Sequence, residues 1–136
     1  MHYAAENGSL NVILAMVSRG AGIDPTDTFE RTPLMIAIEN NKSAVSRSLI
    51  ELGADIEGID IYGKTPLMYA CKIGSKEIVE LLIKCKADPK VVNKVGDSAI
   101  TMARKSGNED IIMLLVKTGA SLRPSSRSRP VGPIKK

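Results

Sequence analysis

The sequence repeats itself at a step of 33 residues, and this step constrains the fold more than any other feature. The segment TPLMIAIENN begins at Thr32, TPLMYACKIG begins at Thr65, and SAITMARKSG begins at Ser98. One further step back aligns MHYAAENG, from Met1, with LMIAIENN without a gap. A second block keeps the same step, in the order MVSRGAG, LIELGAD, LIKCKAD and LVKTGAS. A fixed period of this length predicts a linear stack of similar units.

Each unit is predicted to contain two helices joined by a turn. Thr32, Thr65 and Ser98 are of the residue types that cap a helix through the hydroxyl. Proline follows both threonines, at the first helical position, where no N–H is needed. Apolar residues in the second half of the unit cover more than one helix face, which suits a helix packed by its partner and by neighbouring units. The segments between units, such as 55–64, are short and polar and contain a glycine, so we expect extended fingers.

The composition fits such a helical stack. Hydrophobic residues make up 43% of the chain, charged residues 25% and aromatic residues only 3%, with no Trp. The core must therefore be built from Leu, Ile, Val, Met and Ala. Two cysteines are too few for a small disulfide framework and indicate an intracellular setting, cytoplasmic or nuclear. No apolar run approaches the length of a membrane span, so no membrane partner is expected.

The net charge of +4 comes from the end of the chain. Residues 1–122 contain 14 basic and 15 acidic residues, whereas 123–136 contain five basic residues and no acid. This last segment is rich in Pro, Ser and Arg, so we expect a disordered basic tail. Its simplest role is a solvated linker, and the alternatives are a phosphorylatable segment, a nuclear address or a weak nucleic-acid contact. No aromatic residue stands beside these charges, so specific nucleic-acid binding is not expected.

The period of 33, together with TPLM, a small residue one turn later, LL and GAD, resembles the ankyrin repeat. The resemblance covers about residues 1–122. It implies a mainly α fold, an ankyrin-repeat solenoid of antiparallel helix pairs with short β-hairpin fingers. The repeats would span about 1–26, 27–59, 60–92 and 93–122. The first repeat lacks its finger, and we expect the chain to be a piece of a larger multidomain protein.

Three positions depart from the family pattern. Glu30 stands where the other fingers have glycine, which predicts a different or strained turn. Lys86 replaces the glycine that closes the second helix, at a cost of roughly 1 kcal/mol for a left-handed side chain. Arg104 replaces a small core residue in the fourth repeat, which suits an end without a neighbour.

No arrangement of residues predicts catalysis, a cofactor or a metal ion. His2 is the only histidine, and the resemblance implies that it bonds to the backbone of a finger. Cys71 is expected to be buried and Cys85 exposed, and two cysteines with one histidine make no zinc spacing. We therefore expect a protein without enzymatic activity and without a cofactor.

The resemblance implies that the fingers and the exposed side of the short first helices form a concave surface for a protein or peptide partner. The predicted contact residues are Thr28, Phe29, Arg31, Glu39, Asn40, Ile59, Ile61, Tyr62, Lys64, Lys72, Ile73, Lys94, Val95 and Asp97. Phe29, Tyr62 and Val95 recur at the 33-residue step, which places one apolar side chain at the same fingertip site of three repeats. Either these side chains pack finger against finger, or they form a binding hot spot.

The sequence is consistent with two functions. It does not predict an oligomeric state. The first is a noncatalytic protein-binding module that uses the concave surface. The second is a nuclear or chromatin-associated module that contacts nucleic acid or a histone tail with help from the basic tail. Binding of the second kind would weaken strongly as salt is added.

Overall fold

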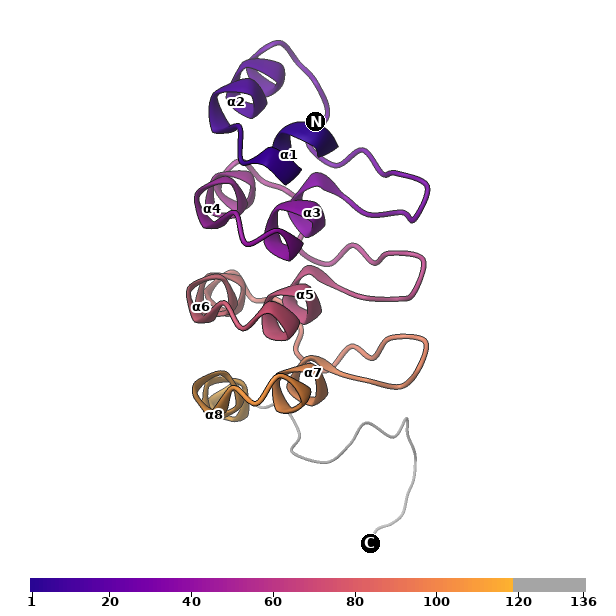
Figure 1. Ribbon diagram of the computed structural model, residues 1–136, viewed down its shortest axis with the longest axis vertical. Helices are drawn as coiled ribbons and strands as arrows, with labels where there is room; N and C mark the ends of the chain where they lie inside the picture. The colour runs from indigo at the N-terminus through magenta and orange to yellow at the C-terminus, as the bar shows by residue number, and fades with distance from the viewer. Residues whose placement is uncertain (119–136) are drawn as a thin grey trace, which may run out of the picture.

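A computed structural model describes residues 1–118. In this part of the chain α-helices stand in two columns, and the fingers project from one side (Figure 1). The inner column, next to the fingers, holds α1 (His2–Asn7), α3 (Pro33–Glu39), α5 (Pro66–Ile73) and α7 (Ala99–Lys105). The outer column holds α2 (Leu10–Ser18), α4 (Ser43–Glu51), α6 (Lys76–Lys84) and α8 (Glu109–Lys117). The predicted tail, 123–136, lies outside the described residues.

Thr32, Thr65 and Ser98 cap the inner helices, as predicted. Each side-chain oxygen accepts a hydrogen bond from the backbone N–H three residues later, at 3.3, 3.2 and 3.4 Å. In the outer column Ser75 and Asn108 cap α6 and α8 in the same way, at 3.4 and 3.2 Å. Because a capping oxygen satisfies a backbone donor that the helix leaves free, the local sequence determines where these helices begin.

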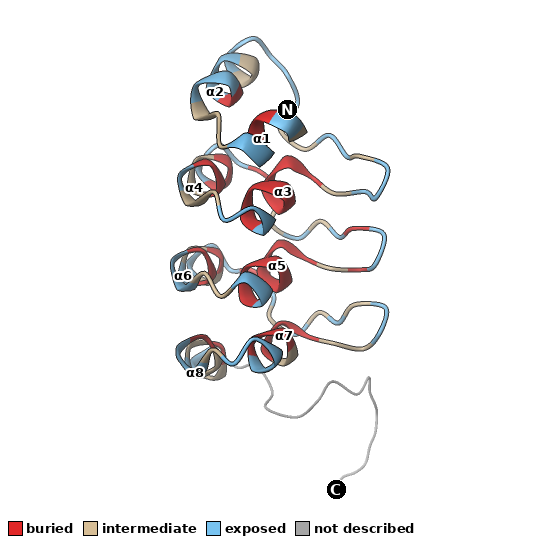
Figure 2. Ribbon diagram, in the orientation of Figure 1, coloured by how far each residue is buried: buried red, intermediate tan, exposed pale blue. Residues whose placement is uncertain are grey.

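The core is a continuous layer of apolar side chains between the helices (Figure 2). Leu34, Leu67 and Ile100 stand 33 residues apart in the sequence, and each is at most 1% exposed. Ala37 and Ala70, fully buried in the inner column, keep the helices there close together. Equivalent positions are thus buried in successive repeats, and the same contacts hold the stack along its axis. The predicted solenoid of helix pairs is confirmed.

The fingers are hairpin-shaped loops, centred on residues 27–31, 60–64 and 93–97. Among the described residues there is no strand and one isolated antiparallel bridge, between Val92 and Ser98. A single backbone hydrogen bond closes the base of each finger; in the last one the residue 93 N–H donates to the residue 97 carbonyl at 2.8 Å. The predicted hairpin path is therefore present without a ladder of paired strands.

Glu30 and Lys86 adopt the left-handed backbone that the sequence predicts, with φ of 61° and 73°. The turn at Glu30 matches the glycine turn at Gly63, because each N–H donates to the carbonyl three residues earlier at 2.9 Å. This finger therefore keeps the common turn and bears the strain of a left-handed side chain, about 1 kcal/mol. Arg104 is exposed where the equivalent Cys71 is buried, as predicted.

Candidate partner-binding surface

A carboxylate or amide side chain holds each finger in shape. In the middle finger, Asp60 Oδ1 accepts hydrogen bonds from the N–H groups of Tyr62 and Lys64, both at 2.8 Å. Asp27 and Asn93 make the same pair of bonds in the fingers before and after, at 2.8 to 3.0 Å. Side-chain bonds of this kind hold a turn without help from a sheet, so the loop beneath each fingertip is hydrogen-bonded within itself.

Neighbouring fingers are joined through the backbone at their tips. The Phe29 carbonyl accepts a hydrogen bond from the Ile61 N–H, and the Tyr62 carbonyl accepts one from the Lys94 N–H, both at 2.9 Å. The side chains of Phe29, Tyr62 and Val95 nevertheless stay 46%, 56% and 79% exposed. Backbone atoms thus make these contacts between fingers, and the three side chains, called the fingertip ladder below, stay open to solvent.

The other predicted contact residues lie on the fingers and at the ends of the inner helices. None of the predicted contact residues is buried. Arg31, Lys64 and Asp97 are partly exposed. The exposed ones, besides the fingertip ladder, are Thr28, Glu39, Asn40, Ile59, Ile61, Lys72, Ile73 and Lys94. All of them are accessible to a partner, and their role in binding stays a prediction.

Arg31 organises the charged contacts of the first finger. Its Nε donates to Asp27 Oδ2 at 2.9 Å and its Nη1 donates to Glu39 Oε1 at 3.1 Å. Its guanidinium carbon lies 5.2 Å from the centre of the Phe29 ring, within cation–π range. Burial opposes ionisation of Asp27, but the hydrogen bonds from Arg31 and the Phe29 N–H, together with the charge of Arg31, hold the pKa of this carboxyl below its usual value. Arg31 therefore links the first finger to Glu39 on α3 and to Phe29 of the fingertip ladder.

Lys64 takes the equivalent position in the middle finger and lies among aromatic rings. Its ammonium is 5.8 Å from the centre of the Tyr62 ring and 4.9 Å from that of Tyr69. The Tyr69 hydroxyl donates to Asp60 Oδ2 at 2.5 Å, and burial together with this bond raises the pKa of Tyr69. Asp60 is only 2% exposed, so its carboxylate serves the finger and is not offered to a ligand.

Two small hollows open beside these residues, and they differ in chemistry. The first, of about 300 Å³, has almost wholly apolar walls and is lined by Tyr62, Lys64, Asn93, Lys94, Val95 and Met102. The second, of about 270 Å³, is lined by Glu6, Arg31, Ile36, Glu39 and Asn40. The first suits an apolar side chain next to a basic rim, whereas the second contains two carboxylates.

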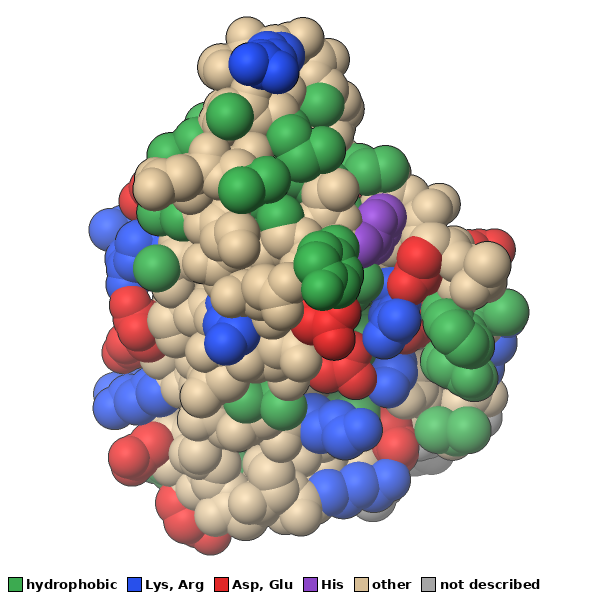
Figure 3. Space-filling view, turned by 45° about the horizontal axis from the view of Figure 1, so that its top comes forward, with side chains coloured by type: hydrophobic (Ala, Val, Ile, Leu, Met, Phe, Trp, Pro, Cys, Tyr) green, Lys and Arg blue, Asp and Glu red, His purple; other side chains and the backbone are tan. Residues whose placement is uncertain are grey.

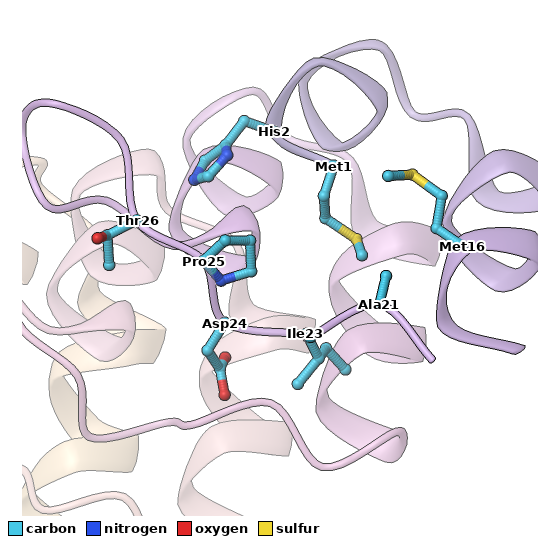
Figure 4. A pocket seen from close by; sticks show the side chains of 9 residues that line it. Met1, His2, Met16, Ala21, Ile23, Asp24, Pro25 and Thr26 are labelled. Carbon is cyan, nitrogen blue, oxygen red and sulfur yellow. The ribbon is translucent and has the colours of Figure 1, made fainter. Parts of the chain in front are cut away.

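A larger hollow, of about 810 Å³, lies at the first repeat (Figure 4). Met1, Met16, Ala21 and Ile23 form its apolar side. Met16 occupies the same repeat position as Leu49. Met16 is partly exposed, whereas Leu49 is fully buried. The hollow therefore lies at a face of the first repeat that no other described repeat covers. Its polar lining comes from His2, Asp24 and Thr26, and the His2 ring already contacts the backbone of a finger.

His2 and the two cysteines follow the sequence-based predictions. His2 Nε2 lies 2.8 Å from the Arg31 carbonyl, a contact from α1 to the backbone of a finger. Cys85 is exposed, and Cys71 is buried, which raises the pKa of its thiol to about 12. No group of three or more His, Cys, Asp or Glu side chains between residues 1 and 118 is placed to hold a metal ion.

Three residues that shape the fingers were not among the predicted site residues. Asp27, Asp60 and Asn93 recur at the 33-residue step, and aligning DTFER, DIYGK and NKVGD reveals them. The repeat alignment does not reveal the bond from Tyr69 to Asp60, because Ile36 and Met102, at the equivalent positions of the neighbouring repeats, have no hydroxyl. A repeat alignment finds what all fingers share and misses a contact that one finger alone makes.

Comparison with known families agrees with this architecture. A family model described as ankyrin repeats, in three copies, matches residues 1–93. The chain therefore belongs to the ankyrin repeat family, whose repeats are generally protein–protein interaction modules and typically noncatalytic. No curated protein matches the chain at a significant level. In the described part of the chain, no helix is both long and apolar enough to cross a membrane.

Proposed function

We propose that this chain is a noncatalytic, intracellular binding module of a larger multidomain protein, and that it holds a partner protein or peptide on its fingers and short helices. The observation that carries the proposal is the fingertip ladder. Its side chains are about half exposed or more, while the backbone beneath them is tied from finger to finger. Apolar anchors presented on a rigid frame lose little conformational freedom on binding, which favours a hot spot.

The test replaces two members of the fingertip ladder with alanine, as Phe29→Ala and Tyr62→Ala together. The probes are peptides selected against the folded protein from a displayed random library. We expect binding to weaken by about 2 kcal/mol or more, because buried aromatic anchors dominate interfaces. We expect the free energy of unfolding to change by less than about 1 kcal/mol, because both side chains are exposed.

Met113→Ala is the matched control, because Met113 is a large apolar side chain on the outer helix α8 and is 57% exposed. It should leave peptide binding unchanged. If the ladder variant melts far below the parent while its folded fraction binds as before, the aromatic side chains are structural and the proposal fails.

The nucleic-acid or histone-tail alternative depends on the basic tail, 123–136, which lies outside the described residues. Deleting that segment separates the two functions. Binding on the fingers and short helices survives the deletion, whereas binding that disappears with the tail and with added salt would favour the alternative.

A further inference from the structure

In two repeats the finger and the short helix are joined by an ion pair between positions that stand eight residues apart. In the second repeat Arg31 donates to Glu39 at 3.1 Å, and in the fourth repeat Lys105 donates to Asp97 at 2.7 Å. The basic partner is on the finger in one repeat and on the helix in the other. These positions therefore lie close enough for their side chains to meet, whichever one carries the positive charge.

The equivalent positions of the third repeat, Lys64 and Lys72, are both basic. Neither lysine forms an ion pair within residues 1–118. The Lys64 ammonium lies over two rings, and the acid of its own finger, Asp60, is buried and bonded to Tyr69. The repeat pattern thus places an uncompensated pair of cations at the centre of the predicted binding surface.

The surroundings of this pair add an apolar component. The hollow of about 300 Å³ borders Lys64, with Tyr62, Val95 and Met102 in its apolar wall. Lys94, at the rim of the same hollow, is exposed and forms no ion pair with the described residues. Figure 3 shows several basic side chains next to a group of apolar side chains on this face, with acidic side chains among and above them. One region thus combines free positive charge with a pocket for an apolar group.

We infer that the partner segment is an acidic peptide that places a carboxylate between Lys64 and Lys72 and a neighbouring large apolar side chain in the hollow beside Tyr62. This inference rests on the proposed function and names the chemistry of its partner. The second and fourth repeats each form an ion pair between their own finger and helix. In the third repeat the partner supplies the missing carboxylate. The apolar side chain supplies the buried contact that a surface ion pair alone does not.

An acidic peptide fits this surface better than a nucleic acid does. Glu39 and Asp97 occupy the same two positions in the repeats on either side of the lysine pair. The strongly basic region is therefore about one repeat wide. A phosphate backbone needs a longer positively charged track and several stacking side chains, whereas a single peptide carboxylate needs only the one lysine pair.

The test uses Lys72→Glu, which gives the third repeat the same acidic residue that the second repeat has at Glu39. The exposed position and the equivalent glutamate both indicate that the variant folds. The probes are peptides selected from a displayed random library, labelled and measured by fluorescence anisotropy. We expect the selected peptides to share Asp or Glu beside a large apolar residue, and Lys72→Glu to weaken their binding about tenfold or more.

Lys76→Glu is the matched control, because Lys76 is an exposed lysine of the outer helix α6 and the charge change is identical. It should alter the affinity by less than about twofold. A second measurement replaces the peptide carboxylate by its amide. This change should weaken binding to the parent protein and have little further effect on Lys72→Glu, because both changes remove the same contact.

Three results overturn the inference, and they are distinguishable. Peptides that carry no acid, and that lose binding in Phe29→Ala/Tyr62→Ala but not in Lys72→Glu, overturn the acidic partner and leave the proposed function standing. Peptides affected by neither variant, or no peptides at all, overturn both. A single-stranded oligothymidylate that binds more tightly than any peptide, and is lost in Lys72→Glu, assigns the site to nucleic acid.

Discussion

Glu30 holds a turn in a backbone conformation that its side chain disfavours. Its φ of 61° lies in the left-handed region that Gly63 and Gly96 occupy in the other two fingers. We predict that Glu30→Gly raises the free energy of unfolding by up to about 1 kcal/mol, because relief of backbone strain outweighs the added freedom of the unfolded chain. Urea denaturation followed by circular dichroism measures the change.

Asn41 supplies the control for this prediction. Its φ of 59° is nearly that of Glu30, but asparagine tolerates the left-handed region better than glutamate does. Asn41→Gly should therefore gain less stability than Glu30→Gly. A Glu30→Gly protein no more stable than the parent would show that the first finger turn is not strained.

The two cysteines provide a second prediction for single residues. Burial raises the pKa of the Cys71 thiol to about 12, whereas Cys85 is exposed. At mildly alkaline pH iodoacetamide should modify Cys85 alone in the folded protein and both cysteines in urea, as mass spectrometry measures. Because burial disfavours the thiolate, the free energy of unfolding should fall as the pH rises from the ordinary thiol pKa toward 12. Rapid labelling of Cys71 in folded Cys85→Ser protein would contradict the buried position.

The outer helices carry equivalent apolar positions that differ in how well they are covered. Val12 on α2 is 49% exposed, whereas Val45, one repeat later on α4, is 1% exposed. We predict that Val45→Ala lowers the free energy of unfolding by about 2 kcal/mol, through lost burial and the cavity left behind. Val12→Ala should cost less than about 0.5 kcal/mol. Urea titration of both variants tests this, and equal costs would refute the unequal burial.

The contrast between Arg31 and Lys64 shows which parts of the repeats a sequence can predict. The 33-residue step correctly places both residues at the base of a finger, and it correctly places the caps of the inner helices. It does not predict what a long charged side chain contacts. Arg31 pairs with Glu39 and lies over the Phe29 ring, whereas the next repeat has Lys72 in place of Glu39, and the Lys64 ammonium lies over the rings of Tyr62 and Tyr69. The repeat pattern predicts where the backbone of each residue lies. The contacts of a charged side chain depend on residues that differ from one repeat to the next.

Across the whole molecule, stability should grow with the number of stacked interfaces between repeats. The exposed core positions of the first repeat, Val12 above all, form one interface that the described residues leave open. A second copy of residues 34–66 placed directly before Met1 keeps the 33-residue step, because that segment ends in the Thr-Pro pair that precedes Leu67. We predict that this extension raises the melting temperature by about 5 °C or more, as differential scanning calorimetry measures.

The extended chain makes Val12 the test of how the added repeat packs. If the new helices stack in register, they cover Val12 as the first repeat covers Val45, which is 1% exposed. Val12→Ala should then cost about 2 kcal/mol in the extended chain, against less than about 0.5 kcal/mol in the original one. An extension with one residue deleted before Met1 breaks the step and serves as the control. If Val12→Ala costs the same in all three chains, the end of the array does not accept a further repeat, and stability does not follow the stacking of equivalent positions.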